Sequence, residues 1–470
     1  MGCFMRPESA GGLAVIARIW KSAVLWAFLT TGLRLGGFIF VLPVALRRLS
    51  PDHLGIWYAM QGLSSLVILM EAGLSPLLSR LASYYYAGAK KVPSLGLDTE
   101  PVETDAPPNE SALAGLVKMA RTFYGRFAIF AFVFMAVGGS SWLGLKFHAV
   151  FLRSDVWPAY MLYAVGVALV MSGFFWGDLL SGTHQVRSSY RNTILGLVLN
   201  YVVSIVLLLT GHGLISLAAG QMVMSLLPRW MARRQYLARF PTVKYPHPQM
   251  TSIKELLPMC WRSAVTQLSA YFLARSMTLV AAQVLDLHAT ASLGLCLQFG
   301  FALAGISQSW LAVKYPTLIQ LRTKRDGAGL RRVVHERMAM SLATYAAGAV
   351  VILVAAPFFI HLIGSRTPLL PTPIFAALLG VLGMDLYMGL NTATMISENR
   401  VRYMVPFLIS GLATLALSVV LGRWLGLVGI ILAPFLVQLC WNYWWTPMAC
   451  WQGLRLKTAT EIQATELEAT

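Results

Sequence analysis

The chain has 470 residues, of which 57% are hydrophobic and only 12% are charged. Because a soluble domain carries about 25% charged residues, this composition excludes a large soluble globular protein and indicates a polytopic membrane protein. The net charge of +18 would suggest nucleic-acid binding in a soluble protein. In a membrane protein, basic residues instead gather in short cytoplasmic loops, so no nucleic-acid partner is expected.

Long apolar runs predict twelve membrane-spanning helices. Each run covers the roughly 20 residues that a helix needs to cross the hydrocarbon, and uninterrupted apolar runs favour helices over a β-barrel. In chain order the predicted spans are 22–46, 54–78, 126–146, 158–181, 192–211, 213–230, 256–284, 289–313, 338–363, 372–396, 402–422 and 427–449. The expected fold class is an all-α polytopic membrane protein.

The loop between the sixth and seventh spans divides the chain into two halves. Leu54-Gly55 aligns with Leu293-Gly294 at an offset that also aligns Gly88 with Gly327, so we interpret the halves as an internal duplication. Two parallel repeats place a substrate site between the halves, near the midplane of the bilayer. The predicted domains are an N-terminal six-helix lobe over 1–230 with a flexible insertion at 92–111, a cytoplasmic linker at 231–255, a C-terminal six-helix lobe over 256–450 and a cytoplasmic tail at 451–470.

The distribution of lysine and arginine predicts the orientation. When basic residues at the ends of spans are counted with the adjoining gaps, one set of gaps and both terminal segments hold 28 of the 37 basic residues. The alternate gaps hold six, and three lie deep within spans. Since basic loops stay on the cytoplasmic side, both termini are expected in the cytoplasm. No HExxH, CxxC or Walker A motif is present, so we expect no metal site, no cofactor and no ATP hydrolysis by that route.

The three basic residues within spans are Arg34, Arg262 and Arg275. An arginine inside a membrane is a functional hypothesis by default, and guanidinium is shaped to bind phosphate or carboxylate. These residues are therefore predicted to bind an anionic substrate, or alternatively to be structural. Arg262 and Arg275 would lie about 140° apart on an ideal helix, so we expect only one of them to join Arg34 at a substrate site.

Three carboxylates also fall within the predicted spans: Asp385, Glu71 and Asp178. A buried carboxylate either pairs with a cation or stays protonated. The sequence therefore leaves two alternatives, a coupling or gating role and a fixed ion pair that holds the bundle together. For Glu71 and Asp178 a partly hydrated position at the inner rim is also an alternative.

Two segments carry a family resemblance. Leu49–Arg80, LSPDHLGIWYAMQGLSSLVILMEAGLSPLLSR, resembles the L-S/T-P-x-x-(L/F)-G-x-(W/Y) pattern of Wzx-type polysaccharide flippases. Phe174–Asn200, FFWGDLLSGTHQVRSSYRNTILGLVLN, is similar to their inside loop between spans 4 and 5. These flippases belong to the MOP superfamily, together with the multidrug MATE exporters.

The resemblance implies two six-helix lobes forming a V, as in MATE-like transporters, and alternating access. It also implies a function, the transfer of an undecaprenyl-diphosphate-linked oligosaccharide from the inner to the outer leaflet of the bacterial inner membrane, for surface polysaccharide or exopolysaccharide. The diphosphate would bind the arginines, and partners would be membrane lipids and the polymerase and glycosyltransferases of the pathway. Two alternatives remain, a MATE-like multidrug or cation antiporter and a membrane-embedded glycan polymerase or ligase. The short outside loops disfavour the enzyme.

Overall fold

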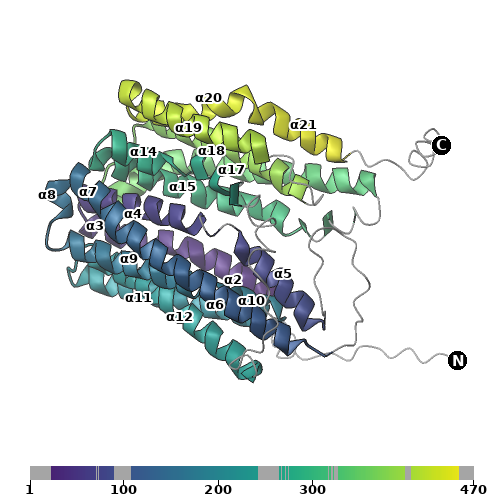
Figure 1. Cartoon of the computed structure of the whole chain (residues 1–470). Coiled ribbons are helices and arrows are strands. Elements are labelled where there is room, and N and C mark those ends of the chain that lie inside the picture. The colour runs from purple at the N-terminus through teal and green to yellow at the C-terminus, as the bar shows by residue number, and fades with distance from the viewer. Residues whose placement is uncertain are drawn as a thin grey trace, which may run out of the picture. The chain divides into compact units, whose positions relative to one another are not determined.

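The computed structural model describes residues 23–69, 71, 73–88, 107–241, 264–265, 267–269, 271–273, 275–315, 317–318, 321, 326–396 and 404–454. Throughout these ranges the extended regular elements are helices (Figure 1). The expectation of an all-α fold is therefore confirmed for this part of the chain. Compact packing divides the protein into unit 1, residues 1–48 and 71–261, and unit 2, residues 49–70 and 262–470.

Unit 1 is built around a hairpin of two long helices, α11 and α12, with α9 packed on α12 and α6 packed on α9. Its aromatic core joins α5, α6, α10 and α12, where Tyr124, Phe175 and Tyr236 are fully buried. The elements of unit 1 are α2 (Ala23–Gly36), η1 (Gly37–Val41), α3 (Leu42–Arg48), α5 (Leu74–Tyr86), α6 (Glu110–Val133), η2 (Phe134–Gly139), α7 (Ser140–Lys146), α8 (His148–Phe151), α9 (Val156–Ser172), α10 (Phe175–Gly182), α11 (Val186–Leu209) and α12 (Ile215–Arg239).

Unit 2 has α15 at its centre, in contact with α4, α14, α17 and α18. The largely apolar face of α15 is almost completely buried along its first two turns. The elements of unit 2 are α4 (Pro51–Leu69), α14 (Met277–Val284), α15 (Leu287–Ala312), α17 (Gly327–Ile363), α18 (Thr372–Ile396), α19 (Met404–Leu425), α20 (Leu427–Cys440) and α21 (Asn442–Leu454).

Eight of the described helical segments are long and apolar enough to cross a membrane, and nine if the bent pair α20–α21 counts as one span. Two segments, Glu110–Lys146 and Gly327–Ile363, are 37 residues long. At 1.5 Å per residue each is about 55 Å long, more than the hydrocarbon requires. Both helices begin well before the predicted spans. The added turns of α6 bury Leu113, Leu116 and Tyr124 in the core of unit 1, whereas those of α17 carry several charged residues. The predicted total of twelve spans stays a prediction.

Several predicted spans are interrupted. The predicted span 54–78 comprises α4 and α5, which are separated by a turn where Gly73 adopts a left-handed conformation (φ +68°) that glycine tolerates without strain. The predicted span 158–181 comprises α9 and α10, separated at Gly173. The pair α20–α21 bends by 45° at Trp441. Each break leaves backbone carbonyls that need partners.

Two π-helical segments also interrupt helices of unit 1: η1 lies between α2 and α3, and η2 lies between α6 and α7. Such segments are rare and are frequent at functional sites. A tyrosine from a neighbouring helix bonds to a carbonyl close to each one. Tyr201 donates to the carbonyl of Leu33, 2.7 Å away, one turn before η1, and Tyr160 donates to Met135 within η2, 2.5 Å away.

Unit 2 contains α4, although the chain on both sides of α4 belongs to unit 1. The first turns of α4 and α15 meet through glycine: a Cβ on Gly55 would lie 2.4 Å from the carbonyl oxygen of Leu287, and one on Gly294 would lie 2.4 Å from the ring of Tyr58. Gly55 contacts Leu287, and Tyr58, three residues later in α4, contacts Gly294, seven residues later in α15. The two helices therefore run in the same direction here.

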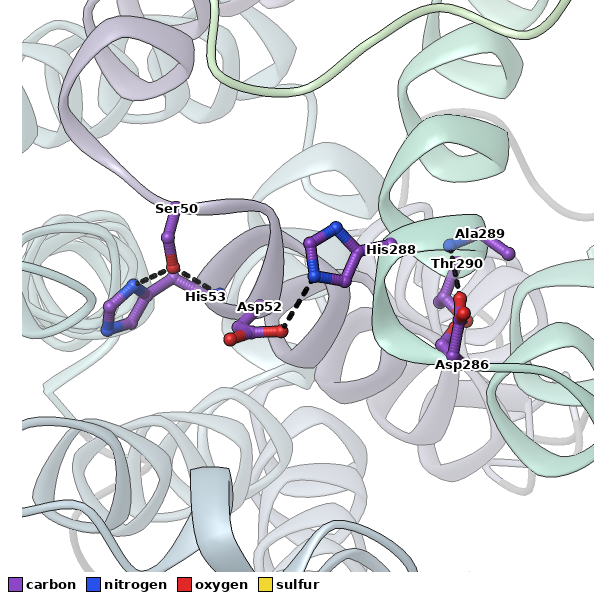
Figure 2. Close-up of polar contacts among 7 residues, drawn as sticks. All are labelled: Ser50, Asp52, His53, Asp286, His288, Ala289 and Thr290. Atoms are coloured by element: carbon purple, nitrogen blue, oxygen red, sulfur yellow. Dashed lines mark hydrogen bonds and ion pairs between the residues drawn. The ribbon is translucent and has the colours of Figure 1, made fainter.

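Polar residues surround the start of this helix pair (Figure 2). Nε2 of His288 lies 3.5 Å from Oδ1 of Asp52. Asp286 caps α15 by accepting a hydrogen bond from the backbone N–H of Ala289, 2.7 Å away. Asp286 is a favourable N-cap because its carboxylate satisfies a free N–H and lies at the positive end of the helix dipole.

The predicted lobe boundaries at 230 and 256 remain a prediction. The predicted linker 231–255 begins with helix, since α12 continues to Arg239. The predicted insertion 92–111 ends in the first turn of α6, which Asn109 caps by accepting from Ala112, and residues 92–106 lie outside the described residues. Within the predicted tail, α21 continues to Leu454.

Candidate functional site

Arg34 lies in the last turn of α2, directly before the π-helix η1. Its side chain is exposed, and the ion pairs among the described residues do not include it. Tyr201 of α11 interacts with it electrostatically and contacts the same turn, because Gly37 has no side chain: a Cβ there would lie 3.0 Å from the tyrosine ring. An exposed guanidinium without a carboxylate partner is available to an anion.

Arg275 is also exposed, in the turn that precedes α14. Its guanidinium carbon lies 4.7 Å from the ring centroid of Phe301 on α15, a distance at which a cation is attracted to the face of the ring. The backbone N–H groups of Arg275 and Ser276 both bond to the carbonyl of Tyr271, at 2.8 and 3.1 Å. The chain turns here before α14 begins at Met277. The angle of about 140° between Arg262 and Arg275 stays a prediction. Arg262 lies outside the described residues.

Asp385 of α18 lies opposite the bend between α20 and α21. Its Oδ1 accepts hydrogen bonds from Nε2 of Gln438, 2.6 Å away, and from the hydroxyl of Tyr443, 3.1 Å away. Its Oδ2 is buried without a hydrogen-bond partner among the described residues, and so are Oε1 of Gln438, Oδ1 of Asn442 and the hydroxyl of Thr446. The ion pairs of the described chain leave Asp385 without a basic partner.

Buried oxygens without partners are costly, since each forfeits the hydrogen bond that it had with water. Gln438, Asn442 and Thr446 are completely buried. Gln438 bonds to Asp385, and Asn442 and Thr446 lie in α21 after the helix break, where Nδ2 of Asn442 is also buried without a partner among the described residues. Buried oxygens beside a helix break suit a proton, an ordered water or a hard cation. No group of three His, Cys, Asp or Glu side chains with metal-binding geometry occurs in the described ranges.

Glu71 and Asp178 come together in unit 1. Glu71 is buried, and its Oε1 accepts hydrogen bonds from the hydroxyl of Tyr124 and from the backbone N–H of Ser75, the latter 2.8 Å away. The side chain of Ser75 also bonds to Asp178, which interacts electrostatically with Glu71 and with Arg229. Oδ2 of Asp178 is buried without a partner among the described residues. This buried network replaces the alternative of a partly hydrated inner-rim position for Glu71.

Arg229 is the residue that sequence reasoning missed. Arg229 is the next-to-last residue of the predicted span 213–230, and the count of basic residues assigns it to the cytoplasmic loop that follows, whereas its side chain folds back into unit 1. Nε donates to the carbonyl of Val170 at 3.1 Å, and Nη1 donates to Met224 at 3.0 Å and Ser225 at 3.1 Å. One local signal exists: Pro228 precedes Arg229, and proline inside a helix frees a carbonyl that needs a donor.

The sequence matches no protein-family model and no curated protein. Solved structures are similar over nearly the whole chain. An inward-facing multidrug resistance MATE family transporter of the MOP superfamily is 14% identical, with a TM-score of 0.65 over 93% of this chain and 100% of that one. An outward-facing MATE family transporter is 14% identical, with a TM-score of 0.55 over 95% and 97%.

A MOP superfamily transporter from Pyrococcus furiosus is also 14% identical, with a TM-score of 0.51 over 95% of this chain and 97% of that one. The chain has the fold of a MOP-superfamily transporter. At this identity the similarity establishes the fold alone. The expected all-α, MATE/MOP-like fold is therefore confirmed, and the Wzx-type resemblance remains a hypothesis.

Proposed function

We propose that the protein is a flippase that moves an undecaprenyl-diphosphate-linked oligosaccharide from the inner to the outer leaflet by alternating access. The bacterial inner membrane is the proposed location, with both termini in the cytoplasm. The polymerase and glycosyltransferases of the same pathway are proposed partners. The proposal rests on the MOP fold and on the cationic character of the exposed side chains within it.

The exposure of Arg34 is the observation that carries the proposal. The side chain lies within an apolar segment, Leu29–Arg48, and is not neutralised by a carboxylate among the described residues. A bare charge in a span costs about 2.5–3.5 kcal/mol on insertion scales, so a ligand that neutralises it is a physical reason to retain it. A diphosphate supplies two charges and acceptor oxygens that match the guanidinium fork.

Arg275 adds a second exposed guanidinium. Arg34 belongs to unit 1 and Arg275 to unit 2, so each unit presents one cation. Both would repel the organic cations that a multidrug exporter carries. For the MOP superfamily transporter from Pyrococcus furiosus, reverse polarity of the binding pocket likewise suggests a different function.

Flipping breaks no covalent bond, so the mechanism requires no nucleophile and no general base. The diphosphate binds the arginines, the sugars stay hydrated, and the polyprenyl tail remains in the bilayer. Movement of the protein between two states then changes the leaflet from which the bound head group is accessible. The arginines act as fixed charges that replace the hydration of the phosphates.

Reconstituted proteoliposomes test the proposal with a fluorescent polyprenyl-diphosphate-linked sugar. Arg34→Ala is expected to lower the initial flipping rate at least tenfold, and Arg34→Lys to recover only part of it because bidentate contacts are lost. Arg423→Ala, which removes an exposed arginine from the last turn of α19, serves as the matched control. Flipping by Arg34→Ala at the rate of this control would overturn the assignment.

A MATE-like cation antiporter is a second candidate, favoured by Asp385. This carboxyl has no basic partner among the described residues and lies beside other buried oxygens without partners. Such a group can bind a proton or a sodium ion that drives transport. Ethidium efflux driven by a proton or sodium gradient, and lost in Asp385→Asn, would favour the antiporter. Gradient-driven flipping of the lipid-linked sugar, lost in the same variant, would make Asp385 the coupling residue of the flippase.

A further inference from the structure

Arg229 is held in place by the backbone of unit 1. Pro228 has no N–H, so the carbonyl of Met224 loses the partner that a regular helix would give it, and Nη1 of Arg229 takes that position at 3.0 Å. Val170 lies in the last turn of α9, where carbonyls also lack intrahelical partners, and Nε of Arg229 bonds to it at 3.1 Å. The guanidinium therefore joins two helix irregularities.

The aliphatic part of the Arg229 side chain is also held in place. A Cβ on Gly173, at the break between α9 and α10, would lie 3.1 Å from Cβ of Arg229 and 3.2 Å from its Cδ, so the glycine makes room for the stem. The guanidinium carbon lies 6.0 Å from the ring centroid of Phe174. These contacts fix the position of one positive charge close enough to Asp178 to interact with it electrostatically.

The charges of this group do not balance when every residue is ionised. Two carboxyls, Glu71 and Asp178, interact with each other electrostatically, and the guanidinium of Arg229 is the cation seen to interact with the second. Full ionisation leaves one uncompensated negative charge in the interior, and two bound protons leave one uncompensated positive charge. Only one bound proton makes the group neutral, which is the state that burial favours.

The hydrogen bonds determine which carboxyl holds that proton. Glu71 accepts from two donors, Tyr124 of α6 and the backbone of Ser75 in α5, and donors of this kind favour an ionised carboxylate. Asp178 accepts one hydrogen bond, from the side chain of Ser75, while its Oδ2 is buried and accepts none from the described residues. Besides α5, α6 and α12, helix α11 also packs on α10. It places the hydroxyl of Ser189, which is uncharged, next to Gly177.

We infer that Glu71, Asp178 and Arg229 form a site that exchanges a single proton, carried on Oδ2 of Asp178, and that Arg229 is the positioning residue that limits the pair to one. Hydronium gives its proton to the carboxylate of Asp178 and becomes water, and release is the reverse. The inference deepens the proposed transport function by assigning proton coupling to unit 1. It differs from a structural role for Arg229, in which the residue only satisfies free carbonyls.

Infrared titration of the purified, substrate-free protein tests the inference independently of transport. A C=O band of a protonated carboxyl should disappear as the pH rises and should be missing from Asp178→Asn, whereas any band from the buried carboxyl of Asp385 should persist in that variant. In Arg229→Gln the band should persist to a pH at least one unit higher, a tenfold change in proton concentration, because the charge that favours ionisation is gone. Arg229→Lys should return the midpoint towards that of the unaltered protein.

The structural role predicts a different pattern. If Arg229 only satisfies free carbonyls, Arg229→Lys and Arg229→Gln should behave alike, and the midpoint of the infrared titration should not move in either variant. That result would overturn the inference, as would identical infrared titrations of Asp178→Asn and the unaltered protein. If Arg229→Gln does not fold, Glu71→Gln decides instead: it leaves Asp178 and Arg229 to neutralise each other, so the midpoint should fall if the group exchanges one proton, and an unchanged midpoint would overturn the inference. If the unaltered protein does not flip the lipid-linked sugar but its infrared titration is as described, the proposed function is contradicted and the proton site is not.

Discussion

Gly55 of α4 lies directly against the backbone carbonyl of Leu287, at the start of α15: a Cβ on this glycine would come 2.4 Å from the oxygen. A backbone carbonyl within a helix cannot move away by changing rotamer, as a flexible side chain can. Gly55→Ala must therefore separate the two helices, and overpacking of this kind costs about 1–3 kcal/mol. We expect the variant to unfold at a lower temperature in detergent, as followed by circular dichroism.

Gly305→Ala supplies the matched control on α15 itself. Nothing lies within 4 Å of the position where its Cβ would be added. Alanine is favoured over glycine in a helix by about 0.8–1 kcal/mol, so this variant should be as stable as the unaltered protein or slightly more so. Equal melting temperatures for the two alanine variants would contradict the close contact at Gly55.

The ion pair between Asp52 and His288 joins the same two helices, yet we expect it to contribute little. The side chains are 26% and 64% exposed, so water screens their attraction (Figure 2). Exposed pairs contribute about 0–1 kcal/mol in double-mutant cycles. Asp52→Asn, His288→Gln and the double variant should differ by no more than this in free energy of unfolding. A coupling energy well above that range would mean that the pair is shielded from solvent.

The sequence predicts the helical fold well because hydrophobicity over some twenty residues identifies a span regardless of neighbours. It also aligned Gly55 with Gly294, and both turned out to lie in the contact of α4 with α15. Hydropathy averages over short interruptions, however. The breaks at Gly73 and Gly173 fall inside runs that remain apolar, so each appeared as one uninterrupted span.

The candidate site was predictable only in part, for a related reason. An arginine in mid-span, such as Arg34, is visible because its surroundings are apolar. Arg229 lies at the end of a span, where basic residues are expected on the cytoplasmic side, and only the tertiary fold brings it to Asp178. The partners of Asp385 lie more than fifty residues away along the chain, at Gln438 and Tyr443, a pairing that spacing cannot reveal.

Tyr201 offers a test of how Arg34 is positioned. Its hydroxyl donates to the carbonyl of Leu33, 2.7 Å away, in the turn that carries the arginine. Tyr201→Phe keeps the ring against Gly37 and removes the hydroxyl's hydrogen bonds to the backbone of Leu33 and Gly37, each of which contributes about 0.5–1.5 kcal/mol. We expect a small loss of stability and a several-fold drop in flipping rate, because Arg34 is held less firmly. Tyr190→Phe on the same helix is the control, and it should leave flipping unchanged.

The net charge of the proposed cargo leads to a further prediction, a response to membrane potential. Moving one charge across 100 mV is worth about 2.3 kcal/mol, so the outward transfer of two phosphate charges gains roughly twice that if they cross uncompensated. If the arginines neutralise them, the gain comes instead when the empty cationic protein returns. Either way an inside-negative potential should accelerate net flipping. Proteoliposomes at fixed pH and sodium, with the potential set by potassium and valinomycin, measure this directly, and a rate indifferent to the imposed potential would contradict electrogenic export of an anion.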